Sequence, residues 1–111
     1  MSEQTQQSIA KGINLVANKL SPVSNFITAS KTVTTAGTAE QLGEDISVSW
    51  VAIQAKTANT NPVFIGDFSV DSTNGYSLAA LESIVLPVAN LNLIWLDATT
   101  NGEGVNIIYG K

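Results

Sequence analysis

Residues 93–109, LIWLDATTNGEGVNIIY, hold two apolar runs with a polar turn between them. β-Branched and aromatic residues are frequent in both runs, and residues of this kind favour strands. The segment TTNG at 99–102 separates the runs, and Asn followed by Gly suits a reversal of the chain. The stretch therefore predicts strands at 93–98 and 104–109 with a turn between them.

The same pattern, runs of β-branched and aromatic residues separated by turn residues, extends over the chain from Phe26 onward. Turn residues recur about every 8–12 positions, a spacing typical of an all-β sandwich or barrel. The other turns are placed at Ala36-Gly37, at Asn59-Thr60-Asn61-Pro62 and at Asn74-Gly75. The remaining strands are predicted at residues 27–35, 38–42, 46–56, 62–66, 68–71, 76–79 and 83–88.

The beginning of the chain has a different periodicity. Its apolar residues form one stripe if residues 3–20 are helical, and the stripe consists of Ile9, Ile13, Val16, Ala17 and Leu20. Ser21-Pro22 ends the predicted helix. The chain is thus divided into a helical arm, 1–24, and a β-sandwich domain, 25–111.

An isolated helix of this length is marginal in water, so the stripe needs a cover. Two surfaces could cover the stripe: the chain's own β domain, or a neighbouring subunit on which the arm docks. We predict that Ile9, Ile13, Val16 and Leu20 are protein-interface residues of the arm.

Several predicted strands are apolar on both faces. Ile46 and Val48 alternate with serines, whereas Val51 and Ile53 continue on the opposite phase, with Trp50 at the changeover. Either a bulge changes the face there, or the strand is buried on both sides. The runs at 93–96 and 107–108 show the same property. Such strands need a covering helix or a subunit contact, and we favour the subunit contact.

The composition excludes several classes of function. Charged residues make up 13% of the 111 residues, and the formal net charge is −4. All five basic residues are lysines, and the absence of arginine forks argues against nucleic acid as a partner. Without histidine or cysteine the chain has no nucleophile–histidine pair and no zinc site built on these residues. We therefore expect no enzyme activity, no small-molecule substrate and no cofactor.

Membrane insertion and export are not expected either. No run of about 20 apolar residues occurs, and such a run is what a membrane-spanning helix needs. The chain starts with Met1-Ser2-Glu3-Gln4, which is polar and acidic where a secretory signal is basic and then apolar. The protein is expected to stay in the cytoplasm where it is made unless a particle carries it out.

Two groups of residues offer small-ligand sites, and each also has a simpler structural role. Asp67, Asp71, Ser72 and Asn74 could supply oxygen ligands to calcium, but their spacing is not that of an EF-hand loop, and an Asx-rich turn explains them better. A sugar-stacking platform could form from the aromatic residues. Packing in a core or an interface is favoured for them. These residues are Trp50, Phe64, Phe68, Tyr76, Trp95 and Tyr109.

A set of segments between Thr32 and Tyr109 follows one another in a characteristic order. They are Thr35-Ala36-Gly37-Thr38-Ala39 with Leu42, Val51-Ala52-Ile53-Gln54-Ala55, Asn59, Val63-Phe64-Ile65-Gly66, Glu82-Ser83-Ile84, Leu93-Ile94-Trp95-Leu96-Asp97-Ala98 and Gly102-Glu103-Gly104-Val105. This order of segments resembles small tailed-phage decoration, or cement, proteins with β-sandwich or jelly-roll folds. One position departs from the pattern: a Pro-Gly turn is expected before Glu82, where this chain has Ala80-Leu81.

The resemblance implies a mainly β fold, an antiparallel sandwich or jelly roll of about eight strands, to which this chain adds its amphipathic arm. It implies a structural virion protein that binds the outer surface of a phage capsid and stabilises capsomer contacts, with the major capsid protein as partner and a homotrimer as the assembly. Its location would be the capsid surface after synthesis in the host cytoplasm. The alternative is a glycan- or receptor-binding β module of a phage fibre or tail.

Overall fold

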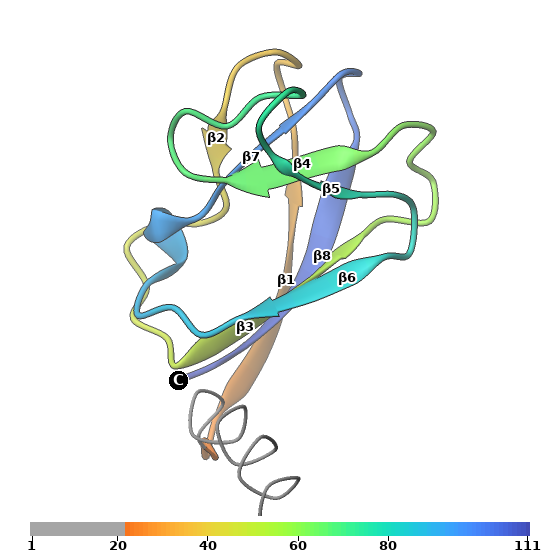
Figure 1. The fold of residues 1–111 in the computed structure, drawn as a ribbon. Coiled ribbons are helices and arrows are strands. Elements are labelled where there is room, and N and C mark those ends of the chain that lie inside the picture. The colour runs from red at the N-terminus through yellow and green to blue at the C-terminus, as the bar shows by residue number, and fades with distance from the viewer. Residues whose placement is uncertain (1–21) are drawn as a thin grey trace, which may run out of the picture.

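The computed structural model describes residues 22–111, which form two four-stranded antiparallel sheets (Figure 1). Sheet A contains, in spatial order, β1 (Phe26–Thr32), β8 (Gly104–Gly110), β3 (Trp50–Ala55) and β6 (Ser83–Leu86). Sheet B contains β2 (Glu40–Gln41), β7 (Trp95–Ala98), β4 (Val63–Gly66) and β5 (Tyr76–Leu78). The one helical element in this part of the chain is a 3-10 turn, η1 (Leu91–Leu93). The mainly β prediction is confirmed, and the predicted helix at 3–20 lies outside the described residues.

The two sheets share one hydrophobic core. In β3 every second residue, namely Val51, Ile53 and Ala55, is fully buried. The side chains that meet them from β8 and from sheet B are Val63, Ile65, Leu78, Leu96, Ala98, Val105, Ile107 and Tyr109. Complete burial of a Val or Ile side chain contributes about 1.5–3 kcal/mol, so this alternation fixes which face of each strand turns inward.

Eight of the nine predicted strand segments contain a strand. The strand predicted at 68–71 is wrong, because the backbone there is held in turns by its own acidic side chains. Asp67 Oδ1 accepts hydrogen bonds from the N–H and hydroxyl of Ser69 at 2.9 and 2.6 Å. Asx turns of this kind take up the backbone donors that a sheet would need.

The change of phase near Trp50 comes from a bend in the chain. Ser47 forms an isolated bridge to Asn90, the backbone bends at Ser49, and regular pairing begins at Trp50. Val48 is buried before the bend and Val51 after it. Of the two alternatives raised by the sequence, the structure thus has the change of face.

The corner between β5 and β6 has an unusual backbone. The N–H of Glu82 donates to the carbonyl of Ala79 at 2.9 Å, which closes a four-residue turn. Leu81 stands third in this turn with φ at 70°, a conformation that glycine normally adopts. The corner thus places leucine where the resemblance leads one to expect the glycine of a Pro-Gly turn.

Candidate interaction surface

The outer face of sheet A carries its side chains in rows that cross the four strands. The first row is Phe26, Gly110 and Trp50, the second is Thr28, Ile108, Ala52 and Val85, and the third is Ser30, Asn106, Gln54 and Ser83. No residue in these rows is charged. The face therefore passes from apolar to neutral polar along the strands.

This face is hollowed. A shallow concavity of about 630 Å³ lies over its middle, lined by the third row and by the second row except Val85. Beyond the third row, Lys56 Nζ donates to Thr32 Oγ1 at 3.2 Å and places a positive charge at the far end of the face. The concavity is open to solvent.

The chain reaches this face just before β1. The carbonyl of Asn25 accepts from the N–H of Lys111 at 3.0 Å, which extends the β1–β8 pairing. The chain then bends at Ser24, and Val23 lies over Gly110. A Cβ on Gly110 would stand 2.6 Å from Val23 Cγ2 and 2.7 Å from the indole nitrogen of Trp50. Gly110 is therefore the residue that lets Val23 and Trp50 pack on the outer side of sheet A.

The outer face of sheet B is covered by the chain itself. Residues 67–75 cross it, and Val70 packs there with only 4% of its surface exposed. Cβ atoms added to Gly66 and Gly75 would stand 2.9 and 2.7 Å from Val70 Cγ2, so this crossing is close. Phe64, which points outward from β4, is buried underneath. The two sheets therefore differ, because nothing among residues 22–111 crosses the middle of sheet A.

Several large apolar side chains are exposed on the described part of the chain. They are Phe26, Ile27, Phe68, Tyr76, Leu81, Val85 and Leu93, of which Phe68 is 73% exposed. Phe26 and Val85 belong to the outer face of sheet A. Phe68, Leu81 and Leu93 lie in connecting segments, and Tyr76 lies on the edge strand β5.

Leu81 is exposed despite its costly backbone. Its side chain is 57% exposed, so burial contributes little to the fold there. Hydrogen bonds hold the corner: the N–H of Leu81 donates to the carbonyl of Ala55 at 3.0 Å, and Gln54 Nε2 donates to the carbonyl of Leu81 at 3.2 Å. A left-handed conformation costs a non-glycine residue about 1–2 kcal/mol. A strained, rigid and exposed apolar residue is suited to contact with a partner.

The Gly-Glu-Gly segment and the asparagine of the resemblance form one structural network. Oε1 of Glu103 accepts from the N–H and hydroxyl of Thr60 at 2.9 and 2.8 Å and from the N–H of Asn61 at 2.9 Å. The side chain of Asn59 donates to the carbonyl of Gly104 and accepts from its N–H. These residues anchor one loop to another, so their role is structural.

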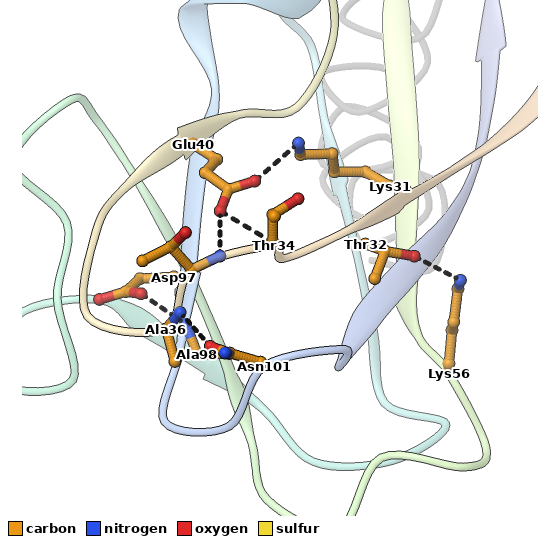
Figure 2. Close-up of polar contacts among 10 residues, drawn as sticks. Lys31, Thr32, Thr34, Ala36, Glu40, Lys56, Asp97, Ala98 and Asn101 are labelled. Atoms are coloured by element: carbon orange, nitrogen blue, oxygen red, sulfur yellow. Dashed lines mark hydrogen bonds and ion pairs between the residues drawn. The ribbon is translucent and has the colours of Figure 1, made fainter.

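A second polar network joins the two sheets at the β1–β2 edge (Figure 2). Lys31 Nζ lies 2.8 Å from Glu40 Oε1, and the N–H groups of Thr34 and Thr35 donate to Glu40 Oε2 at 2.9 Å. Partial burial acts to raise the pKa of Glu40, but the Lys31 hydrogen bond and the two N–H donors outweigh it and hold the pKa below the ordinary value of 4.5. The carboxylate thus closes the loop after β1.

The segment 34–38 is fixed by two further side chains in Figure 2. Asp97 points outward from β7 but is only 2% exposed, and its Oδ1 accepts from the N–H groups of Gly37 and Ala98 at 2.9 and 2.8 Å. Asn101 Oδ1 accepts from the N–H of Ala36 at 2.7 Å. Gly37 and Gly102 both have positive φ, as their predicted turn roles require.

The acidic segment considered for calcium consists of Asx turns. Asp71 Oδ1 accepts from the N–H and hydroxyl of Thr73 at 2.8 and 2.6 Å, and Asn74 Oδ1 accepts from the N–H of Asp71 at 2.8 Å. Hydrogen bonds from Ser69 and from Thr73 lower the pKa values of Asp67 and Asp71 respectively. Within residues 22–111, no three acidic side chains are gathered as a metal site would require.

The six aromatic residues that could form a sugar-stacking platform do not share one surface. Phe64 and Tyr109 are buried, Trp50 and Trp95 are half-buried, and Phe68 and Tyr76 are exposed. Sequence reasoning did not find Leu81, because a positive φ leaves no mark in an Ala-Leu pair. The departure from the Pro-Gly turn was the only signal there.

The four predicted interface residues of the arm, Ile9, Ile13, Val16 and Leu20, lie outside the described residues. Over residues 22–111, no helix is both long enough and apolar enough to cross a bilayer. Comparison with known proteins gave no relative: no family model, no curated protein and no solved structure matches the chain.

Proposed function

We propose that this chain is a structural virion protein that binds the outer surface of a tailed-phage capsid and stabilises the contacts between capsomers. It is made in the host cytoplasm and reaches its final location on the particle. Its partners are the major capsid protein and further copies of itself, with a homotrimer as the assembly. We assign the two sheets to a β-sandwich of the jelly-roll type, and we propose no catalytic role, no cofactor, and no membrane, nucleic-acid or small-molecule partner.

The observation that carries the proposal is the exposure of rigidly held apolar side chains, above all Leu81. Phe68, Tyr76 and Leu93 are 73%, 60% and 58% exposed and supply further contact area. A few well-packed side chains near the centre of an interface, large aromatic ones above all, contribute much of its binding energy. Glycine would relieve the strained corner, so the presence of leucine there is explained if its side chain contacts a partner.

The mechanism is thermodynamic. A protein that binds an assembled shell but not its free subunits stabilises the shell by mass action. Each copy contributes modest contacts, and the sum over many copies makes the shell strongly resistant to disassembly. The chain needs only a stable fold and a complementary surface for this task.

Leu81→Gly tests the proposal because stability and binding should change in opposite directions. Glycine removes the cost of the left-handed backbone, but it also gives the unfolded chain more conformational freedom. The domain should therefore be equally stable or more stable by about 1 kcal/mol. Binding to particles that lack the protein, measured by co-sedimentation, should weaken about tenfold or more, as expected for an interface anchor. Ala80→Gly, one residue away in the same turn, is the matched control and should bind like the wild type.

If the Leu81→Gly protein binds particles as tightly as the wild type, Leu81 does not belong to the interface. A wild-type protein that does not co-sediment with the particles would overturn the function itself.

The alternative function, a glycan- or receptor-binding module of a fibre or tail, draws on the two exposed aromatic rings, Phe68 and Tyr76. Sugars stack on such rings. The two functions separate in one comparison: Phe68→Ala combined with Tyr76→Ala should abolish binding to cells or glycans if the alternative holds, whereas Leu81→Gly should not affect it.

A further inference from the structure

The middle of sheet A is the one broad sheet face that residues 22–111 leave without a cover. Its second row combines Ile108, Ala52 and Val85 with Thr28, and the concavity lies above it. Ile108 and Ala52 are only half-buried although they lie on the two central strands. On sheet B the corresponding outer face is crossed by 67–75. The described residues, 22–111, therefore supply no cover for sheet A.

We propose that the cover is the chain's own arm: residues 3–20 lie as a helix along the outer face of sheet A of the same molecule, antiparallel to β1. The stripe of Ile9, Ile13, Val16 and Leu20 faces the concavity. The inference is independent of the capsid role, which uses the exposed residues Phe68, Tyr76, Leu81 and Leu93. It places the four arm residues against the chain's own sheet, in place of the contact with another protein that the sequence predicts.

The path of the chain just before β1 supports this position of the arm, which we call its seat. Val23 already lies on the outer face of sheet A, over Gly110 and beside Trp50. Leu20 is three residues before Val23, so it starts from the first row of the face. A connection this short favours the molecule's own sheet over that of a neighbouring copy, because the effective concentration of a tethered segment is high.

The dimensions agree. Eighteen helical residues at about 1.5 Å each extend about 27 Å. The seven residues of β1 at about 3.3 Å each extend about 23 Å. The arm therefore spans the face from its first row to the end marked by Lys56.

The distribution of polarity agrees over most of the arm. At about 1.5 Å per helical residue and about 3.3 Å per strand residue, Leu20, Val16 and Ile13 lie over the apolar rows near Trp50 and over the hollow, and Ile9 lies just past the third row. Residues 2–8 are all polar, and they lie beyond the third row, toward Lys56. Glu3 then comes near Lys56, which gives a favourable pairing of opposite charges.

Engineered cysteines test the seat directly, since the natural chain has none. In the full chain, Ile13→Cys combined with Asn106→Cys should form a disulfide on mild oxidation and still run as a monomer on denaturing gels. Two pairs are matched controls and should remain reduced: Asn14→Cys with Asn106→Cys, which moves the arm cysteine off the stripe, and Ile13→Cys with Thr73→Cys, which moves the partner to the loop over sheet B.

A disulfide that links two chains would overturn the proposal in favour of an arm seated on a second copy. Equal crosslinking in all three pairs, or none in any, would overturn it too.

A second measurement does not depend on crosslinking geometry. Ala52→Lys places a charge in the hollow, and it should lower the hydrogen-exchange protection of residues 9–20 at least tenfold while the protection of β3 and β8 stays unchanged. Thr73→Lys should leave the arm unaffected. Unchanged protection of 9–20 in a folded Ala52→Lys protein would contradict the seat.

Discussion

Glu103 shows how one buried side chain can determine the shape of a loop. It is 5% exposed, and a single carboxylate oxygen accepts three hydrogen bonds from Thr60 and Asn61. Its other oxygen, Oε2, is buried without a partner among the described residues. The residue therefore acts as an acceptor that closes the 59–61 turn against the start of β8.

Glu103→Ala should lower the free energy of unfolding by about 2–3 kcal/mol, because two backbone N–H groups lose their acceptor. Glu103→Gln keeps an oxygen that can accept the same three bonds and should cost clearly less. Urea denaturation of both variants measures the difference. Equal losses in the two variants would show that the charge, and not the acceptor geometry, matters at this position.

The Glu40 carboxylate gives the domain an acid-sensitive contact. Its pKa in the folded protein is below the ordinary value of 4.5, so its stabilising effect is complete above about pH 4.5 and is lost as the pH falls through the folded pKa. Urea midpoints at pH 6, 5, 4 and 3 should show Glu40→Gln less stable than the wild type at pH 6, with the difference shrinking toward pH 3. Glu44→Gln, an exposed carboxylate shortly after β2, should follow the wild type throughout. A constant difference between Glu40→Gln and the wild type would contradict this assignment.

At the scale of elements, the segment 67–75 acts as a lining for sheet B although it contains no strand. Its two acidic side chains form turns at either end, and between them Val70 closes over Phe64. The sequence predicted a strand at 68–71 because the pattern of apolar residues in a short buried loop is the same as in a short strand. The local hydrogen bonds of Asp67 and Asp71 decided against the sheet.

Val70→Ala should lower the free energy of unfolding by about 1.5–2.5 kcal/mol, since two buried methyl groups are lost and a cavity is left. Phe68→Ala, in the same loop but exposed, should change it by less than about 0.5 kcal/mol. Chemical denaturation of both variants tests the packing of the loop. A larger loss for Phe68→Ala than for Val70→Ala would mean that the loop is folded differently.

The sequence was informative wherever a residue type has one structural use. Gly37 and Gly102 lie in predicted turns and have positive φ, and the strands predicted at 93–98 and 104–109 agree within two residues with β7 and β8. The sequence did not predict which strands pair. The consecutive strands β7 and β8 belong to different sheets, and β1 pairs with the last strand, β8. Partners so distant along the chain are selected by the packing of the whole core, which periodicity does not record.

For the whole molecule, the proposed assembly predicts a definite mass. Sedimentation equilibrium should give three times the 11.6 kDa of one chain for the homotrimer. Leu81→Gly tests whether the corner belongs to this contact or to the capsid contact: if it belongs to the capsid contact, the trimer should be retained while particle binding is lost. A wild-type protein that sediments as a monomer at all concentrations tested would overturn the trimer while leaving the capsid role open to its own test.

The number of copies per particle tests the capsid role most directly. Particles grown from the genome that encodes this chain would be purified on a density gradient, and the chain would be quantified against the major capsid protein by mass spectrometry with labelled peptide standards. A protein that braces capsomers should be present in a fixed, near-stoichiometric ratio to the shell subunit. A protein absent from the particles, or present in the few copies of a fibre or tail component, would contradict the proposal.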